Sequence, residues 1–73
     1  MPARDFMHVM WDDYASQWRC WVFHNGQVTE REHLPDIPAV VARALELRLP
    51  ADIGDHQGRL RMALRQAGVR LLS

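Results

Sequence analysis

The chain has 73 residues, a net charge of zero, 48% hydrophobic residues and 25% charged residues. Its length predicts a single domain over residues 1–73. The balanced charge excludes a protein that coats phosphates through a general excess of basic residues, and the composition excludes a charge-swollen disordered tail. One feature is uneven, because every aromatic residue lies between positions 6 and 23.

Three strands are predicted in the first half of the chain, over residues 6–11, 18–24 and 27–33. The first two segments are rich in the apolar, aromatic and β-branched residues that strands favour. Asn25-Gly26 separates the second strand from the third and is typical of a type I′ hairpin turn, which needs positive φ at both positions. Such a turn sets the register, so Phe23 is expected to face Val28, and Trp18 to face His33.

This register distributes apolar groups over both faces of the hairpin. One face carries Trp21 and Phe23 together with Arg19, Val28, Glu30 and Glu32, and the other carries Trp18, Val22 and Cys20 together with Thr29, Arg31 and His33. Because Val28 and Leu34 point to the first face, we expect the second face to be the outer surface. A stacking surface for single-stranded nucleic acid would need basic residues beside its aromatic ones, whereas this hairpin carries Glu30 and Glu32.

Two helices follow, over residues 37–49 and 53–67. Asp36 is the expected N-cap of the first helix, and Pro50 ends it. Asp52 or Asp55 is the expected cap of the second helix, and Gly68 suits its C-terminal end. Residues 69–72 are a candidate for a short last strand. The predicted fold is α+β, a small two-layer domain with a three- or four-stranded antiparallel sheet and two antiparallel helices on one face.

The sequence indicates neither a metal site nor an enzyme, and no cofactor is expected. The candidate ligands do not have the spacing of a metal motif, although His33 and Cys20 are predicted to share a face; these candidates are His8, His24, His33, His56 and Cys20. Cys20 lies between two tryptophans, where a free cysteine is usually a small buried hydrophobic residue. Arg31, expected opposite Cys20, is the one feature that would favour a reactive thiolate.

The C-terminal end is basic, since residues 59–73 contain no acidic residue and four arginines, Arg59, Arg61, Arg65 and Arg70. Arg61 and Arg65 are expected on one outer helix face with Met62 beside them. This end is either an electrostatic surface for phosphate or an acidic protein, or a match to the helix dipole. The acidic start of the predicted second helix argues against a DNA-reading helix-turn-helix.

A cytoplasmic protein is expected, because the chain has a single cysteine and no signal-peptide pattern or membrane-spanning stretch. Domains of this size without a disulfide or metal often rely on a second subunit or a partner. Homodimerisation or binding to another protein is therefore expected.

Three segments, WVFHNGQV, DIPAVVARALELRLP and GRLRMALRQAG, succeed one another as a hairpin with an Asn-Gly turn and two helices. This arrangement resembles small phage-encoded type I anti-CRISPR proteins. The resemblance is one of architecture and carries over no individual residue. It implies a protein that binds a subunit of a CRISPR effector complex and blocks the target DNA or the nuclease.

The sequence therefore predicts a small protein-binding inhibitor or adaptor, with an anti-CRISPR protein as its most concrete form. The expected partner-binding residues are Trp18, Val22, Arg31, His33, Arg61, Met62 and Arg65. The alternative is a nucleic-acid-binding transcriptional regulator that uses the arginine-rich C-terminal helix.

Overall fold

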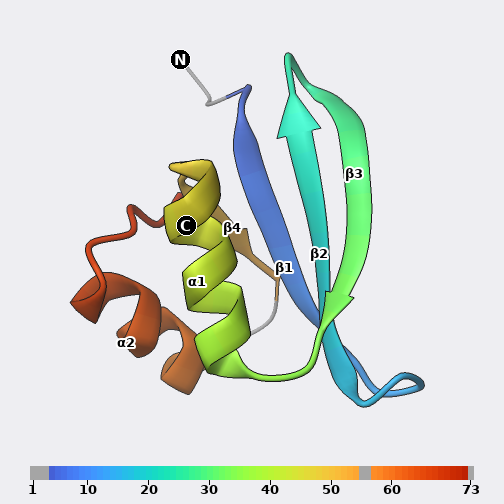
Figure 1. The fold of residues 1–73 in the computed structure, drawn as a ribbon, viewed down its shortest axis with the longest axis vertical. Coiled ribbons are helices and arrows are strands. Elements are labelled where there is room, and N and C mark those ends of the chain that lie inside the picture. The colour runs from blue at the N-terminus through green and yellow to red at the C-terminus, as the bar shows by residue number, and fades with distance from the viewer. Residues whose placement is uncertain (1–3, 55–56, 73) are drawn as a thin grey trace.

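The computed structural model describes residues 4–54 and 57–72. The described elements are β1 (Phe6–Asp12), β2 (Gln17–His24), β3 (Gln27–Leu34), α1 (Ile37–Leu47), β4 (Ala51–Ile53) and α2 (Gly58–Gln66). The strands form one sheet in the order β3-β2-β1-β4. Both helices lie on the same side of this sheet (Figure 1). The predicted α+β fold is confirmed, except that the sheet is mixed, because β4 runs parallel to β1.

The turn between β2 and β3 has the predicted conformation, with φ of 52° at Asn25 and 79° at Gly26. Phe23 pairs with Val28 as expected, but Val22 pairs with Glu30. Thr29 is thus the extra residue of a β-bulge, and its Oγ1 donates a hydrogen bond to the carbonyl oxygen of Val22 at 3.3 Å. From this point the predicted register is wrong by one residue.

The bulge reverses the predicted faces of the hairpin. Trp18 pairs with Leu34 instead of His33. Trp18, Cys20 and Val22 are only 7%, 0% and 6% exposed, so the expectation that they form the outer surface is wrong. The physical reason is that the bulge turns Leu34 toward Trp18, which gives the helix-facing side of the hairpin the apolar residues that it needs.

The first helix begins as predicted and ends two residues early. The side chain of Asp36 accepts a hydrogen bond from the backbone N–H of Ala39 at 2.9 Å, which confirms it as the N-cap. After Leu47 the chain leaves the helix at Arg48, whose φ is 56°. Val40 and Ala44 are the buried residues of α1, and they pack on the strand residues of the core.

The segment that follows α1 is a strand, where the start of a second helix was predicted. Ala51 and Ile53 of β4 are buried, and between them Asp52 is partly exposed. This alternation is that of a strand with one covered face. The helix α2 begins only at Gly58, and its N-cap position is Gln57. Asp52 is therefore not a helix cap, and Asp55 lies outside the described residues.

The C-terminal segment forms one bridge instead of a regular last strand. Gly68, with φ of 85°, follows α2 as predicted. Leu71 then bridges Ala51 in parallel orientation, and the N–H of Leu72 donates to the carbonyl oxygen of Ala51 at 2.9 Å. In the part of the chain described here, no helix is long and apolar enough to cross a membrane.

Candidate functional site on the outer face of the sheet

The side of the sheet opposite the helices carries an aromatic and basic surface, which we call the outer face. The pairing register places on it alternate residues of β1, β2 and β3, together with one residue of β4. These residues are Phe6, His8, Met10, Arg19, Trp21, Phe23, Val28, Arg31, His33 and Asp52. Their neighbours along the strands, such as Met7 and Val9 at 0% exposure, point into the core.

Trp21 lies at the centre of the outer face, between two arginines. The guanidinium carbon of Arg19 is 5.1 Å from the centre of the Trp21 ring, and that of Arg31 is 5.3 Å from it. Both distances are those of cation–π contacts. Among the described residues, neither guanidinium forms an ion pair with a carboxylate. Arg19 also donates a hydrogen bond to the sulfur of Met10 at 3.1 Å, so these partners of the two arginines, a ring and a thioether, are both uncharged.

A second aromatic contact lies at the hairpin-turn end of the outer face. The rings of Phe6 and Phe23, on paired strands, stack with their centres 4.6 Å apart and their planes 10° from parallel. Both side chains are partly buried by each other. The outer face therefore offers two flat apolar groups, the Phe6–Phe23 pair and Trp21.

The acidic residues on and beside the outer face are each paired with a histidine. His8 Nδ1 lies 2.9 Å from the carboxylate of Asp52, and His33 Nε2 lies 2.9 Å from that of Asp12. The hydrogen bond from His33, supported by backbone N–H groups of the following turn, holds the pKa of Asp12 below its ordinary value of 3.8. These carboxylates are engaged locally, whereas the arginines are not.

The acidic residues of β3 lie on the helix side, as predicted, but they share that side with Val22 and Cys20 and not with Trp21. Arg43 of α1 binds Glu30 and Glu32 at 2.8 Å each and also contacts Glu46. These carboxylates, Glu32 first among them, raise the pKa of Arg43. The bulge thus moves the negative charge of β3 away from the aromatic surface and uses it to attach α1 to the sheet.

The structure distributes the predicted partner-binding residues over three regions. Arg31 and His33 lie on the outer face, and Trp18 and Val22 lie inside the domain. The other three are on α2 in the helix layer: Met62 is 61% exposed, Arg65 is exposed, and Arg61 is partly buried. They do not form one continuous surface.

Sequence reasoning missed the central residues of the outer face, namely Trp21 with Arg19, and the Phe6–Phe23 pair. Their strands were predicted, but the choice of face depended on β3, in which no residue indicates a bulge. One signal was available in the sequence. If β3 skips one residue, Leu34 comes opposite Trp18, and this apolar pair indicates the buried face of the hairpin.

Cys20 is a fully buried core residue. Glu32, and not Arg31, pairs with it across the sheet. Burial, followed by the negative charge of Glu32, raises the pKa of the Cys20 thiol to about 12. His33 lies on the opposite face, so the predicted Cys20–His33 pair does not exist. Within residues 4–54 and 57–72 no cluster of metal-ligating side chains is found, and His56 lies outside them.

Comparison with known proteins gives no match: no family model, curated protein or solved structure is significantly similar to this chain.

Proposed function

We propose that this protein is a small protein-binding inhibitor or adaptor whose contact surface is the outer face around Trp21. The observation that carries this proposal is the placement of Trp21 between two arginines that have no acidic partner within residues 4–54 and 57–72. Tryptophan and arginine are the residues that most often dominate the binding energy of protein interfaces. The surrounding residues Phe6, Phe23 and Met10 are of types enriched in interface cores.

The partner that fits this surface is a protein with carboxylates near an apolar patch. The carboxylates would form ion pairs with Arg19 and Arg31, and the apolar groups would pack on Trp21 and the stacked phenylalanines. A nucleic acid fits less well, because Asp12 and Asp52 balance the two arginines in charge. A row of phosphates would gain little net attraction from such a surface.

The most concrete form of the proposal is an inhibitor that binds a CRISPR effector subunit in the bacterial cytoplasm. Its support is the architectural resemblance of the hairpin and the two helices. A single reduced cysteine, buried in the core, agrees with a reducing compartment. Homodimerisation remains a second prediction for the same outer face.

Nucleic-acid binding is the second candidate, and one observation favours it. The bulge places Arg31 beside Trp21 and next to Arg19, where Glu30 was expected. Arginine beside an exposed aromatic ring is what single-stranded nucleic acid stacks on. The exposed arginines of the C-terminal end, Arg59, Arg65 and Arg70, are the other basic group.

The test compares two outer-face variants with one helix variant in a phage-plating assay and a capture assay. Trp21→Ala and Arg31→Glu alter the outer face, and Arg65→Glu makes the same charge reversal on α2. The plating assay uses a bacterial host with an active type I CRISPR system. The wild type and Arg65→Glu are expected to restore plating, and the outer-face variants to lose most of this effect. Circular dichroism checks that every variant is folded.

Two results would contradict the proposal at different levels. If the wild type does not restore plating on hosts carrying type I systems, the CRISPR form of the proposal is wrong. If a partner captured by the wild type is captured equally by Trp21→Ala and Arg31→Glu, the outer face is not the contact surface. Binding to single-stranded oligonucleotides that is lost in Arg31→Glu would favour the second candidate instead.

A further inference from the structure

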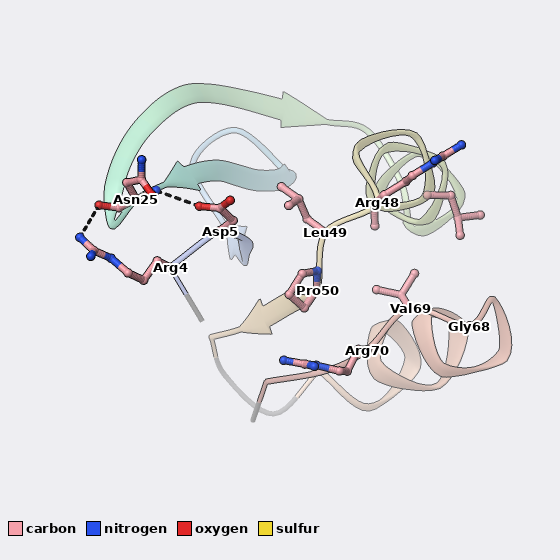
Figure 2. Close-up of a pocket in the computed structure, with 11 residues that line it drawn as sticks. Arg4, Asp5, Asn25, Arg48, Leu49, Pro50, Gly68, Val69 and Arg70 are labelled. Carbon is pink, nitrogen blue, oxygen red and sulfur yellow. Dashed lines mark hydrogen bonds between the residues drawn. The ribbon is translucent and has the colours of Figure 1, made fainter. Parts of the chain in front are cut away.

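A groove lies at the hairpin-turn end of the domain, built by segments that are far apart in the sequence. Its volume is about 690 Å³. Figure 2 shows it between the start of β1, the β2–β3 turn, the end of α1 and the segment after α2. The residues that line it include Arg4, Asp5, Arg48, Pro50, Val69 and Arg70. None of them belongs to the outer-face set.

Positive charge dominates this groove. Arg4, Arg48 and Arg70 line it, and among the described residues none of the three forms an ion pair. Arg4 donates only to the backbone carbonyl of Asn25, at 3.0 Å. Asp5 carries the one carboxylate among the described residues that line the groove, and this carboxylate already accepts the N–H of Asn25 at 2.9 Å and lies 3.3 Å from His24.

Arg70 is the central cation of this region. In Figure 2 its side chain extends from the C-terminal segment toward the side of the groove where Arg4 lies, whereas the guanidinium of Arg48 points away from both. Arg70 also lines an adjoining hollow of about 530 Å³, together with Arg65. Of the three arginines that line the groove, Arg70 is thus the one whose side chain extends into this region, since Arg4 is bound to Asn25 and Arg48 points away.

The floor of the groove is apolar and is held in place by backbone hydrogen bonds. Leu49, Pro50 and Val69 form this floor. The carbonyl of Pro50 accepts from the N–H of Met7, and the N–H of Val69 donates to Leu64, each at 2.9 Å. The volume is that of a small-molecule site, and such sites combine an apolar lining with a few placed polar groups.

We propose that this groove binds a phosphate monoester attached to a flat apolar body, such as a nucleoside monophosphate. Guanidinium groups bind phosphate oxygens through paired, charge-assisted hydrogen bonds, which assigns the phosphate to Arg70. The flat body would lie on Pro50 and Leu49. The C-terminal end of α1 opposes an anion here, and the positive charge of Arg48, directly after that helix, offsets this effect. The proposal is independent of the outer face.

The test titrates the full chain with adenosine monophosphate and follows the backbone amide signals by NMR. Adenosine and inorganic phosphate are titrated separately, so that the contributions of the flat body and the anion are measured.

Arg70→Gln removes the central cation, and Arg59→Gln is the matched control, because Arg59 is exposed and lines a different hollow at the start of α1. We expect shifts at residues 48, 49 and 68–70. We also expect affinity to fall roughly tenfold in Arg70→Gln, the effect of one charged hydrogen bond, and to stay unchanged in Arg59→Gln.

Three outcomes would overturn the proposal. These are the absence of shifts at millimolar adenosine monophosphate, an equal loss of affinity in both variants, and inorganic phosphate binding as tightly as the nucleotide. A last arm compares oligonucleotides with and without a terminal phosphate. Tighter binding of the phosphorylated oligonucleotide than of the free nucleotide would support the site and identify a nucleic-acid end as the source of the phosphate.

Discussion

Asp12 connects three parts of the sheet through one carboxylate. One oxygen accepts from the backbone N–H groups of Tyr14 and Ala15 in the β1–β2 turn, at 3.0 and 3.2 Å. The other lies 2.9 Å from His33 on β3. All of these partners favour the ionised carboxylate, which is why its pKa lies below 3.8.

This arrangement predicts a loss of stability in acid. A carboxyl whose pKa is lower in the folded state than in the unfolded state binds fewer protons when folded, so its contribution is complete above the ordinary pKa of 3.8. This contribution to stability is lost as the pH falls through the pKa that the carboxyl has in the folded protein. Asp12→Asn is therefore expected to flatten the dependence of the free energy of unfolding on pH below 3.8, measured by urea unfolding at a series of pH values. Asp13→Asn, the change at the next residue, is the control, and an equal flattening in both would contradict the assignment.

The strand β3 determines which surface the hairpin presents. Before the bulge it follows the predicted pairing, and after the bulge every side chain changes face. Glu30 and Glu32 then meet Arg43 on the helix side, and Arg31 meets Trp21 on the other. One extra residue thus separates the acidic layer from the aromatic surface.

Deletion of Thr29 tests this role of the bulge. The deletion removes the unpaired residue and leaves the pairs Phe23–Val28 and Val22–Glu30 adjacent, so the same faces are retained. We expect a folded protein with a modestly lower melting temperature. Deletion of Arg31 is the comparison: the loss of the bulge then keeps the partners of Glu32, His33 and Leu34, but Glu30 moves to the outer face and leaves Arg43. A larger fall in melting temperature is therefore expected for this deletion. An equal fall in melting temperature for the two deletions would contradict the assignment of Thr29 as the extra residue.

The whole molecule depends on one core, which lies between the sheet and the two helices. Met7 and Val9 from β1 and Leu60 and Leu64 from α2 are all 0% exposed, and Trp18 closes one end of the core with an edge-to-face contact to Trp11 at 5.0 Å. A domain of this size has a free energy of unfolding of about 5 kcal/mol. A single large core side chain accounts for most of that.

The two tryptophans of β2 are therefore expected to respond differently to substitution. Trp18→Ala removes a core side chain at a cost of about 3–5 kcal/mol and is expected to unfold the domain. Trp21→Ala loses mainly its arginine contacts, at a cost of about 1–2 kcal/mol, and is expected to remain folded. Guanidinium unfolding followed by circular dichroism measures both. An unfolded Trp21→Ala would contradict the assignment of Trp21 to a surface.

The elements with local signals were predictable. The Asn25-Gly26 turn, the Asp36 cap and Gly68 after α2 each follow from the conformational preferences of one or two residues, and the structure confirms all three. The candidate site was predictable only in part. Arg31 and His33 were chosen correctly as outer residues, but the neighbours assigned to them, Trp18 and Val22, were not.

The features that the sequence did not reveal depend on distant partners. β4 has only three residues, and its pairing with β1 satisfies backbone groups that no local pattern identifies. The bulge at Thr29 likewise exists because Leu34 gains burial beside Trp18 and the two glutamates gain Arg43.

The sequence by itself determined a single α+β domain, its hairpin turn, the start of its first helix and the concentration of its aromatic residues at one end of the chain, because these follow from local preferences and composition. Only the tertiary structure decided which aromatic residues face outward and that basic residues accompany them. The physical reason is that side chains alternate along a strand, so a single unpaired residue, retained for the contacts it brings to the core, exchanges the two faces of everything that follows it.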